Sequence, residues 1–147
     1  MAVHVDLSRC IGCLACEVAC QRLHGRSSID VEVVAESVSV PMLCSHCEKA
    51  PCVMACYTGA LAAEEGRVTY DLQKCTGCGL CLAACPFGAI QDGAVIHKCS
   101  LCLDRGSSPA CVRTCPTPAL VEGEEAAAEI FRRRAARDMA RAWERRG

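Results

Sequence analysis

The cysteines of this chain are spaced to hold iron–sulfur clusters. Residues 75–86 read Cys-Thr-Gly-Cys-Gly-Leu-Cys-Leu-Ala-Ala-Cys-Pro, so three cysteines follow one another at intervals of three and a fourth comes four residues later. A short loop that contains Gly77 and Gly79 can wrap three thiolates around one [4Fe-4S] cube. We expect the fourth cysteine to begin a helix that points away, so that its thiolate reaches a second cluster.

Three more groups of four cysteines predict further clusters of the same kind. Residues 10–20 repeat the spacing, with Gln21 in the place of the proline. In residues 44–56 the second interval is two residues longer, and in residues 99–115 eight residues separate the second cysteine from the third. Every cysteine of the chain belongs to one of the groups. The sixteen candidate ligands are Cys10, Cys13, Cys16, Cys20, Cys44, Cys47, Cys52, Cys56, Cys75, Cys78, Cys81, Cys85, Cys99, Cys102, Cys111 and Cys115.

Disulfides and structural zinc are the alternative uses of so many cysteines. The first residues lack the apolar stretch of a secretory signal and contain no twin arginine, so we expect a cytoplasmic location. A reducing cytosol disfavours pairing all sixteen cysteines as disulfides. Zinc sites usually combine two C-x2-4-C pairs across a longer stretch. Both points favour four [4Fe-4S] clusters as the cofactors.

The composition also favours clusters that fill the interior. Aromatic residues make up 3% of the 147 residues, and much of the 52% hydrophobic fraction is alanine and cysteine. A chain of this length, one domain or two very small ones, can therefore bury little large side-chain surface. Metal binding would then be inseparable from folding. The sequence contains no run of 18 apolar residues, so it predicts no membrane span.

Short extended segments connect the cysteine groups. Residues 2–7 alternate as in a strand, and residues 29–40 have period-2 stretches at each end, with Pro41 as a stop. Glu-Gly and Asp-Gly pairs predict hairpin turns before strands at 67–71 and 94–97. The residues after the fourth cysteine are also alike in three of the groups, so the chain reads as four copies of a cysteine loop, a short helix and a hairpin.

The C-terminal segment differs from the rest. From Glu124 to about Arg146 an acidic start, an arginine-rich end and the absence of internal Gly or Pro predict a helix. Residues 123–147 carry seven arginines against five acidic residues. One stripe of the helix contains Phe131, Ala135, Met139 and Trp143. We expect this stripe to pack on the chain itself or on a partner protein rather than on a membrane surface.

No pattern in the sequence predicts catalysis or nucleic-acid binding. The acidic residues show no pairing for acid–base chemistry, and basic residues are scattered without stacking aromatics. His46 lies between two candidate ligands and could tune a cluster by hydrogen bonding, but cysteines supply all four positions, so we interpret it as a residue at the solvent edge. His4, His24 and His97 are not assigned as ligands either. We predict no catalytic residues, and hence a protein that is not itself an enzyme.

With all four groups in view, the chain resembles the electron-transfer subunits with four [4Fe-4S] clusters that accompany molybdenum or tungsten pterin oxidoreductases, such as dimethyl sulfoxide reductase and formate dehydrogenase. It is similar to the short soluble forms that serve formate hydrogenlyase, carbon monoxide dehydrogenase and tungsten aldehyde oxidoreductase. The resemblance covers residues 3–120 and is most specific in residues 9–20 and 98–117.

The resemblance implies an α+β fold of two ferredoxin-like modules related by internal duplication. Residues 42–96 would form a module inserted into another made of residues 1–41 and 97–120, followed by the helix of residues 121–147. It also implies that the first cysteine group pairs with the fourth, and the second with the third. The four implied ligand sets are Cys10, Cys13, Cys16 and Cys115; Cys20, Cys99, Cys102 and Cys111; Cys44, Cys47, Cys52 and Cys85; and Cys56, Cys75, Cys78 and Cys81.

The function that the resemblance implies is a relay of single electrons. The chain would connect a catalytic subunit, in the first place a tungsten or molybdenum pterin enzyme such as aldehyde oxidoreductase or formate dehydrogenase, with a second redox subunit or carrier. A hetero-oligomer in anaerobic metabolism is expected. The alternatives are a free diffusible polyferredoxin, the iron–sulfur partner of a nickel hydrogenase or carbon monoxide dehydrogenase, and a redox sensor.

Overall fold

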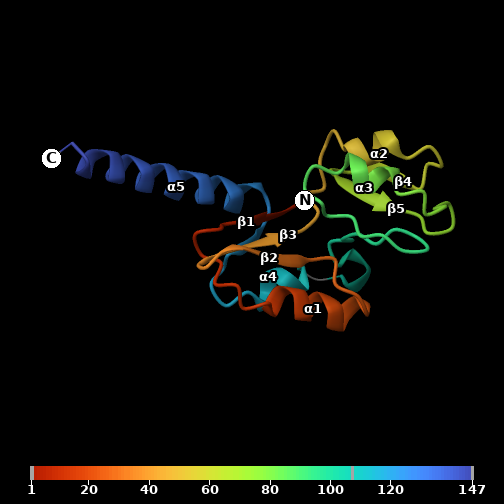
Figure 1. Ribbon diagram of the computed structural model, residues 1–147, viewed down its shortest axis with the longest axis horizontal. Coiled ribbons are helices and arrows are strands. Elements are labelled where there is room, and N and C mark those ends of the chain that lie inside the picture. Colours follow the sequence, from red (N-terminus) through yellow and green to blue (C-terminus); the bar gives the residue numbers. More distant parts are fainter. Residues whose placement is uncertain (1, 107, 147) are drawn as a thin grey trace.

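The chain folds into two groups of small elements and one long helix (Figure 1). This computed structural model describes residues 2–106 and 108–146. The first group contains β1 (Val3–Val5), α1 (Ala15–His24), β2 (Asp30–Ala35), β3 (Val38–Met42), the 3-10 turn η1 (Leu103–Arg105), α4 (Ala110–Thr114) and β6 (Leu120–Glu122). The second contains α2 (Pro51–Ala55), β4 (Leu61–Glu64), β5 (Arg67–Tyr70) and α3 (Leu80–Ala84), and α5 (Glu124–Glu144) ends the chain. The mixture of helices and small sheets confirms the α+β class.

In the described part of the chain, the strands form three antiparallel ribbons of two strands each. β1 pairs with β6, with Val3 opposite Glu122, so the start of the chain is bound to the segment that follows the last cysteine. β2 pairs with β3, and β4 pairs with β5 around the predicted Glu65-Gly66 turn. A ribbon of two strands is marginally stable by itself. The ribbons therefore depend on the helices and cores against which they pack.

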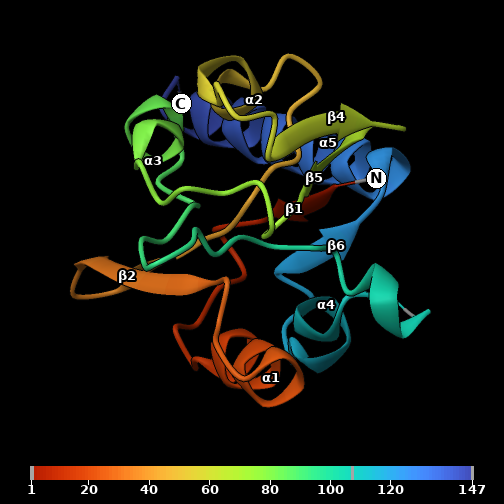
Figure 2. The same cartoon turned by 90° about the vertical axis from the view of Figure 1, so that its right-hand side faces the viewer.

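Two separate hydrophobic clusters form the interior. The first core cluster consists of Val3, Cys16, Cys20, Ile29, Leu43, Leu101, Cys111 and Leu120. The second core cluster consists of Ala50, Cys52, Leu61, Val68, Cys81, Ile90 and Ile96. Helix α1 packs against α4 beside the first cluster and α2 against α3 beside the second, and these helix pairs lie on opposite sides of the molecule (Figure 2). Buried cysteines belong to both clusters.

The prediction of a strand at residues 94–97 is wrong. Gln91 and His97 form only an isolated bridge, in which each backbone N–H donates to the other residue's carbonyl at 2.8 and 2.9 Å. The segment between them bends toward the loop of the third cysteine group, where a Cβ at Gly77 would lie 2.6 Å from the carbonyl oxygen of Ala94. This segment therefore serves as the wall of a cysteine loop rather than as a strand.

Pro41 does not stop the extended segment before it. Residues 29–40 instead contribute to a hairpin, and β3 continues through Pro41, which lies opposite Val31, to Met42. A strand in a two-stranded ribbon has one unpaired edge, and there the missing N–H of proline costs no ladder hydrogen bond.

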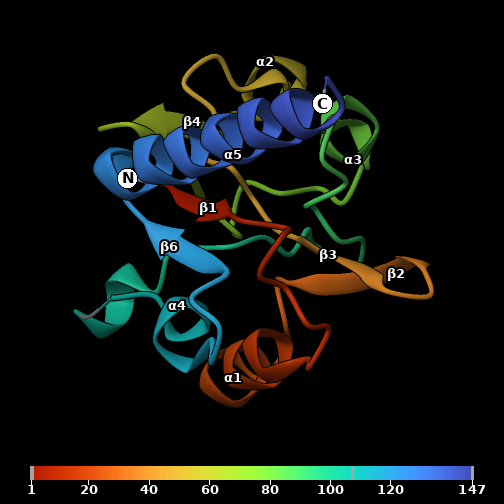
Figure 3. The ribbon, with the colours of Figure 1, turned by 90° about the vertical axis from the view of Figure 1, so that its left-hand side faces the viewer.

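Helix α5 confirms the predicted C-terminal helix but leaves its apolar stripe uncovered. Its first turns contact β6 and bury Ala127, and the helix then projects from the small elements (Figure 1). Figure 3 shows that α5 runs above β1, and Arg137 lies 4.0 Å from Asp6, which follows that strand. Every residue from 131 to 146 is exposed, including Phe131 at 67% and Trp143 at 78%. The stripe therefore does not pack on the rest of the described chain. None of the helices in residues 2–106 and 108–146 has the length and apolar character needed to cross a lipid bilayer.

Candidate metal centres

All four cysteine groups share one local plan. The third cysteine is the second residue of a short helix and is buried; these residues are Cys16, Cys52, Cys81 and Cys111. The fourth cysteine directly follows the helix as its C-cap in three groups, at Cys56, Cys85 and Cys115. In the first group, Cys20 lies inside the longer α1.

The expectation that the fourth cysteine begins a helix is therefore wrong. The interval of four residues spans about one helical turn, and the helix starts one residue before the third cysteine instead. The three C-cap cysteines adopt extended backbone, with ψ of 98° at Cys56, 113° at Cys85 and 112° at Cys115. This extended conformation turns the chain, and with it the fourth sulfur, away from the helix.

Three cavities are each lined by three cysteines of one group and one cysteine of another. Cys10, Cys13, Cys16 and Cys115 line the first, which we name the Cys115 set. Cys56, Cys75, Cys78 and Cys81 line the second, the Cys56 set. Cys20, Cys99, Cys102 and Cys111 line the third, the Cys20 set. In each case the fold joins cysteines that are distant in sequence.

The remaining cysteines form the Cys85 set, which consists of Cys44, Cys47, Cys52 and Cys85. Burial is the main cause that raises the pKa of Cys44, and the neighbouring thiols of Cys85 and Cys47 raise it further. Burial also raises the pKa of Cys52, again with contributions from Cys44 and Cys85. These interactions require the thiols to lie near one another. The four groupings coincide with the four ligand sets that the resemblance implied, whereas ligation itself stays a prediction.

The donor chemistry of these sites fits iron–sulfur clusters. All sixteen cysteines are free thiols. Across residues 2–106 and 108–146, no three side chains of Cys, His, Asp or Glu lie together in a way that could hold a single metal ion. The thiols instead surround cavities with mainly apolar walls, such as the one formed by Val31, Pro41 and Leu120 beside the Cys115 set.

Burial makes several of the thiols weak acids. It raises the pKa of Cys16 to about 11, that of Cys99 to about 11 and that of Cys111 to about 12. These side chains are therefore neutral at pH 7, and binding a cluster as thiolates would release their protons. At Cys56 and Cys115 burial also raises the pKa, but hydrogen bonds outweigh it and the net pKa is lowered.

Several groups donate hydrogen bonds to the cysteine sulfurs or lie close enough to do so. Three backbone amides donate at 3.3 Å: Ser28 N to Cys20 Sγ, Leu101 N to Cys99 Sγ and Ala119 N to Cys115 Sγ. The hydroxyl of Thr58 lies 3.5 Å from Cys56 Sγ, and that of Thr117 lies 3.8 Å from Cys115 Sγ. Such contacts stabilise negative charge on sulfur. The sequence contained a signal for both threonines, because each stands two residues after a fourth cysteine.

His46 is buried, which corrects its interpretation as a residue at the solvent edge. Its Nδ1 accepts a hydrogen bond of 3.1 Å from the N–H of Val68 in β5. Burial, followed by the positive charge of Lys98, lowers the pKa of His46 to about 3, so the ring is neutral. The loop of the second cysteine group folds over the free edge of β5, and the imidazole satisfies a backbone group there.

His24 lies beside a candidate ligand that the sequence did not connect with it. Its Nε2 is 3.3 Å from Cys102 Sγ, although the two residues are 78 positions apart. No local pattern relates them, because α1 and the last cysteine group meet only in the folded chain. His97 is not next to a sulfur in the same way, since its Nε2 lies 2.9 Å from Ser28 Oγ.

Gly77 fits a close approach between two loops. Its φ is +70°, and a Cβ there would lie 2.6 Å from the carbonyl oxygen of Ala94. Gly79, in the same cysteine loop, has a φ of +78°, but a Cβ added to it would meet no atom of the described chain within 4 Å. Both glycines supply left-handed backbone, and only Gly77 also supplies space.

We expect Gly77→Ala to destabilise the iron-loaded protein more than Gly79→Ala does. The left-handed backbone should cost about 1–2 kcal/mol in either variant. The clash with Ala94 should add roughly 1–3 kcal/mol in Gly77→Ala alone. Anaerobic denaturant unfolding, with iron counted per chain, measures the difference. Equal midpoints for the two variants would contradict the packing of this loop.

Two protein-family models match the chain. The model described as a 4Fe-4S dicluster domain matches residues 35–125, and the model described as a 4Fe-4S binding domain matches residues 3–22. The thiosulfate reductase electron transfer subunit PhsB of Salmonella typhi is 44% identical over 149 residues, which cover 86% of this chain and 77% of that protein.

Two further relatives are similar along most of their length. An iron–sulfur protein of Rhodospirillum rubrum is 35% identical over 150 residues, which cover 80% of this chain and 79% of that protein. The electron transport protein HydN of Escherichia coli (strain K12) is 34% identical over 146 residues, which cover 79% of this chain and 83% of that protein.

Proposed function

The chain belongs to the 4Fe-4S dicluster family, and from this premise we propose that it is a non-catalytic electron-transfer subunit of an oxidoreductase complex. Its sixteen cysteines fit four [4Fe-4S] clusters. Each cluster, when bound, supplies one-electron redox chemistry. The relatives named as electron-transfer or electron transport proteins support the same role for this chain.

The observation that carries the proposal is the meeting of cysteines from different groups around common cavities. We assign one cluster each to the Cys115, Cys20, Cys85 and Cys56 sets. The first two sets would belong to a module of residues 1–41 and 97–120, and the other two to a module of residues 42–96. The two core clusters support this division, apart from Leu43, which packs with the first cluster.

The exposure of the cysteines suggests an order for the relay. Cys13 in the Cys115 set and Cys78 in the Cys56 set are exposed, whereas the other sets contain only buried and half-buried cysteines. Exposed apolar side chains flank both ends: Ile11 is next to the first, and Tyr57 and Leu80 are next to the second. We infer that electrons enter and leave near Cys13 and Cys78, and that the Cys20 and Cys85 sets lie between them in the relay.

For the catalytic partner we propose a molybdenum or tungsten pterin enzyme. The resemblance of residues 3–120 to the iron–sulfur subunits of such enzymes supports this choice. PhsB is named as the electron transfer subunit of a thiosulfate reductase, which fits a multi-subunit oxidoreductase.

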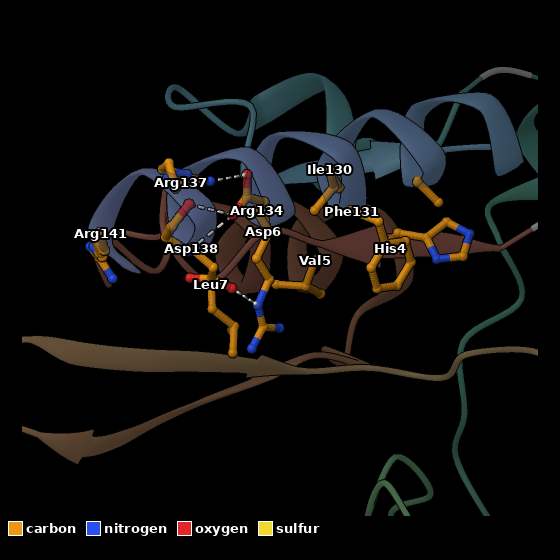
Figure 4. A pocket seen from close by; sticks show the side chains of 12 residues that line it. His4, Val5, Asp6, Leu7, Ile130, Phe131, Arg134, Arg137, Asp138 and Arg141 are labelled. Carbon is orange, nitrogen blue, oxygen red and sulfur yellow. Dashed lines mark hydrogen bonds and ion pairs between the residues drawn. The ribbon is translucent and has the colours of Figure 1, made fainter. Parts of the chain in front are cut away.

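A groove between β1 and α5 offers a surface for that partner (Figure 4). It has a volume of about 390 Å³. Val5, Leu7, Ile130 and Phe131 provide apolar walls. Three arginines, Arg134, Arg137 and Arg141, line the groove together with two acidic residues, Asp6 and Asp138, and Arg134 lies 4.0 Å from Asp138. Residues 130–146 carry seven arginines against two acidic residues, so the exposed part of α5 is strongly basic.

Asp6 lines this groove and interacts with Ser8 and Arg137. Its Oδ1 accepts hydrogen bonds from the Ser8 hydroxyl at 2.5 Å and the Ser8 N–H at 3.1 Å. The Ser8 hydroxyl is the main cause that lowers the pKa of Asp6, and Arg137, 4.0 Å away, also lowers it. The carboxylate is therefore charged at neutral pH and holds Arg137 near β1. We propose that the groove binds an acidic segment with apolar side chains on the catalytic partner.

The experiment that tests the function is anaerobic isolation of the complex from the native source, with Fe, Zn, Mo, W and Ni counted per copy of the chain. Molybdenum or tungsten together with at least about sixteen irons would support the pterin enzyme. Nickel would favour a hydrogenase or carbon monoxide dehydrogenase instead. About sixteen irons without a partner metal would favour a free polyferredoxin, and zinc or far fewer irons would overturn the four clusters.

The same isolation tests the groove. We expect Arg134→Glu combined with Arg141→Glu to lower recovery of the catalytic subunit at least about tenfold, because each change places like charges opposite one another. The matched control is Arg132→Glu with Arg133→Glu, which changes the charge equally on the same helix at residues paired with Glu129. Equal loss in both variants, or a complex that resists both, would contradict docking in the groove.

A further inference from the structure

Lys98 is a buried cation without a carboxylate partner. Only 1% of the surface of Lys98 is exposed. The ammonium donates to the carbonyl oxygens of Val68 at 2.6 Å and Cys99 at 2.8 Å, and it lies 5.7 Å from the centre of the Tyr70 ring. No ion pair joins Lys98 to an acidic side chain within residues 2–106 and 108–146. Burying a charge in this way is costly unless negative charge lies nearby.

The ammonium lies where the two cores meet. Val68 and Tyr70 belong to or pack against the second core cluster, whereas Cys99 packs against the first. Cys99, whose carbonyl accepts from the ammonium, belongs to one inner set, and Val68 donates its own N–H to His46, which stands between Cys44 and Cys47 of the other. Burial raises the pKa of Cys44 and Cys99, and the nearby charge of Lys98 opposes this rise at both thiols. Cys44 belongs to the Cys85 set and Cys99 to the Cys20 set. One cation therefore acts on both of the inner cysteine sets.

A comparison with the other cysteine groups sets Lys98 apart. Arg9, Lys74 and Lys98 each precede the first cysteine of a group. Arg9 pairs with Asp6 at 3.7 Å, and Lys74, with its side chain 60% exposed, pairs with Asp71 at 3.6 Å. Water and carboxylates thus screen these two cations, and Lys98 has neither.

The second cysteine group lacks a preceding cation of its own. Leu43 stands before Cys44, in the position that Arg9, Lys74 and Lys98 occupy in the other groups. Lys98 nevertheless reaches the loop of this group, because its ammonium bonds the carbonyl of Val68, whose N–H donates to His46 between Cys44 and Cys47. The two inner sets therefore share one cation.

The simpler interpretation is a hydrogen-bonded cross-link between two backbone carbonyls. A neutral donor could bond both carbonyls without the cost of a buried charge, so this role does not explain a lysine. Negative charge on thiolate-bound clusters would explain a lysine here, because opposite charges interact strongly in a poorly hydrated interior.

We propose that Lys98 is the shared counter-charge of the two inner clusters and raises both of their reduction potentials. This inference rests on the proposed function. A one-electron reduction adds one negative charge to a cluster, and the nearby ammonium stabilises that added charge. Lys98 would thus help an electron to pass between the inner sites of the two modules. Lys98 would act on the clusters through its charge and would not be a ligand of iron.

The test is a redox titration of the full, iron-loaded chain with dithionite as the reductant, followed by electron paramagnetic resonance. We expect Lys98→Met to lower the reduction equilibrium constant of two of the four couples at least tenfold, which is 59 mV for a one-electron couple. The other two couples should not move. Lys74→Met, a change at the matching position before Cys75, should leave all four unchanged.

Lys98→Gln separates charge from hydrogen bonding, because the amide can still donate to the carbonyls of Val68 and Cys99. We expect it to shift the same two couples as Lys98→Met. If either variant binds its full iron and none of its reduction potentials shifts, the inference is overturned. It is also overturned if neither variant binds iron, since the role of Lys98 would then be structural. A wild-type chain without four reducible clusters would instead overturn the proposed function.

Discussion

Removing iron should unfold both groups of small elements. Helices α2, α3 and α4 have five residues each, and every sheet in the described part of the chain is a ribbon of two strands, so neither type of element is stable alone. Cysteines belong to both core clusters, and aromatic residues make up only 3% of the chain. Without clusters the cysteine-lined cavities would have nothing to hold their walls together.

The expected result is loss of the cooperative thermal transition when iron is chelated anaerobically. Circular dichroism at 222 nm should keep a residual helical signal, because the exposed α5 has Glu129 paired with Arg132 and Arg133 within its own helix. Restoring iron and sulfide should restore the transition, which serves as the control for chemical damage. An iron-free chain that melts cooperatively near the temperature of the loaded protein would show that the clusters are not needed for folding.

The second large effect concerns two cysteines one turn apart on α1. Cys16 and Cys20 are both buried in the first core cluster. Cys16 nevertheless lines a cavity with Cys10 and Cys115, while Cys20 lines another with Cys102 and Cys111. The helix thus presents neighbouring thiols to two different sites.

We expect Cys20→Ser to damage the cluster of the Cys20 set and to spare that of the Cys115 set. Iron should fall from about sixteen per chain to about twelve if the whole cluster is lost, or to about fifteen if only one iron is lost. The lost couple should be one of the two that Lys98→Met shifts. Electron paramagnetic resonance of each variant, with iron analysis, measures both effects.

Cys16→Ser is the matched control, because it makes the same chemical change in the same helix. It should remove a couple that is insensitive to Lys98→Met. Damage to the same cluster in both variants would contradict the crossed ligand sets.

The chemistry was predictable from the sequence because the spacing of cluster ligands is a local property. Three cysteines within seven residues must share a loop, and Gly77 and Gly79 in that loop need left-handed backbone whatever surrounds them. The hairpin of β4 and β5 and the helix α5 were predictable for the same reason, since a Glu-Gly turn and an uninterrupted helical segment act over short distances. The family matches agree with this interpretation of the cysteines.

Two of the predictions that failed concerned contacts between distant segments. The segment at 94–97 has a strand-like pattern, but Ala94 is bent against the loop of Gly77. His46 has the surroundings of an exposed loop residue in sequence, but its ring satisfies the backbone of Val68, 22 residues away. Tertiary contacts outweighed local preference at both positions.

The sequence by itself determined the kind of cofactor and the candidate residues for binding it, because the ligand type and the ligand spacing depend on a few consecutive residues. The family resemblance implied which cysteines from different groups meet, but only the tertiary structure brings them around common cavities and leaves the stripe of α5 exposed. The tertiary structure alone also buried Lys98, a residue whose neighbours in sequence do not distinguish it from the exposed Lys74. Burial depends on what other parts of the chain cover a side chain, and the burial of a charge near thiols depends on the packing of two cores against each other.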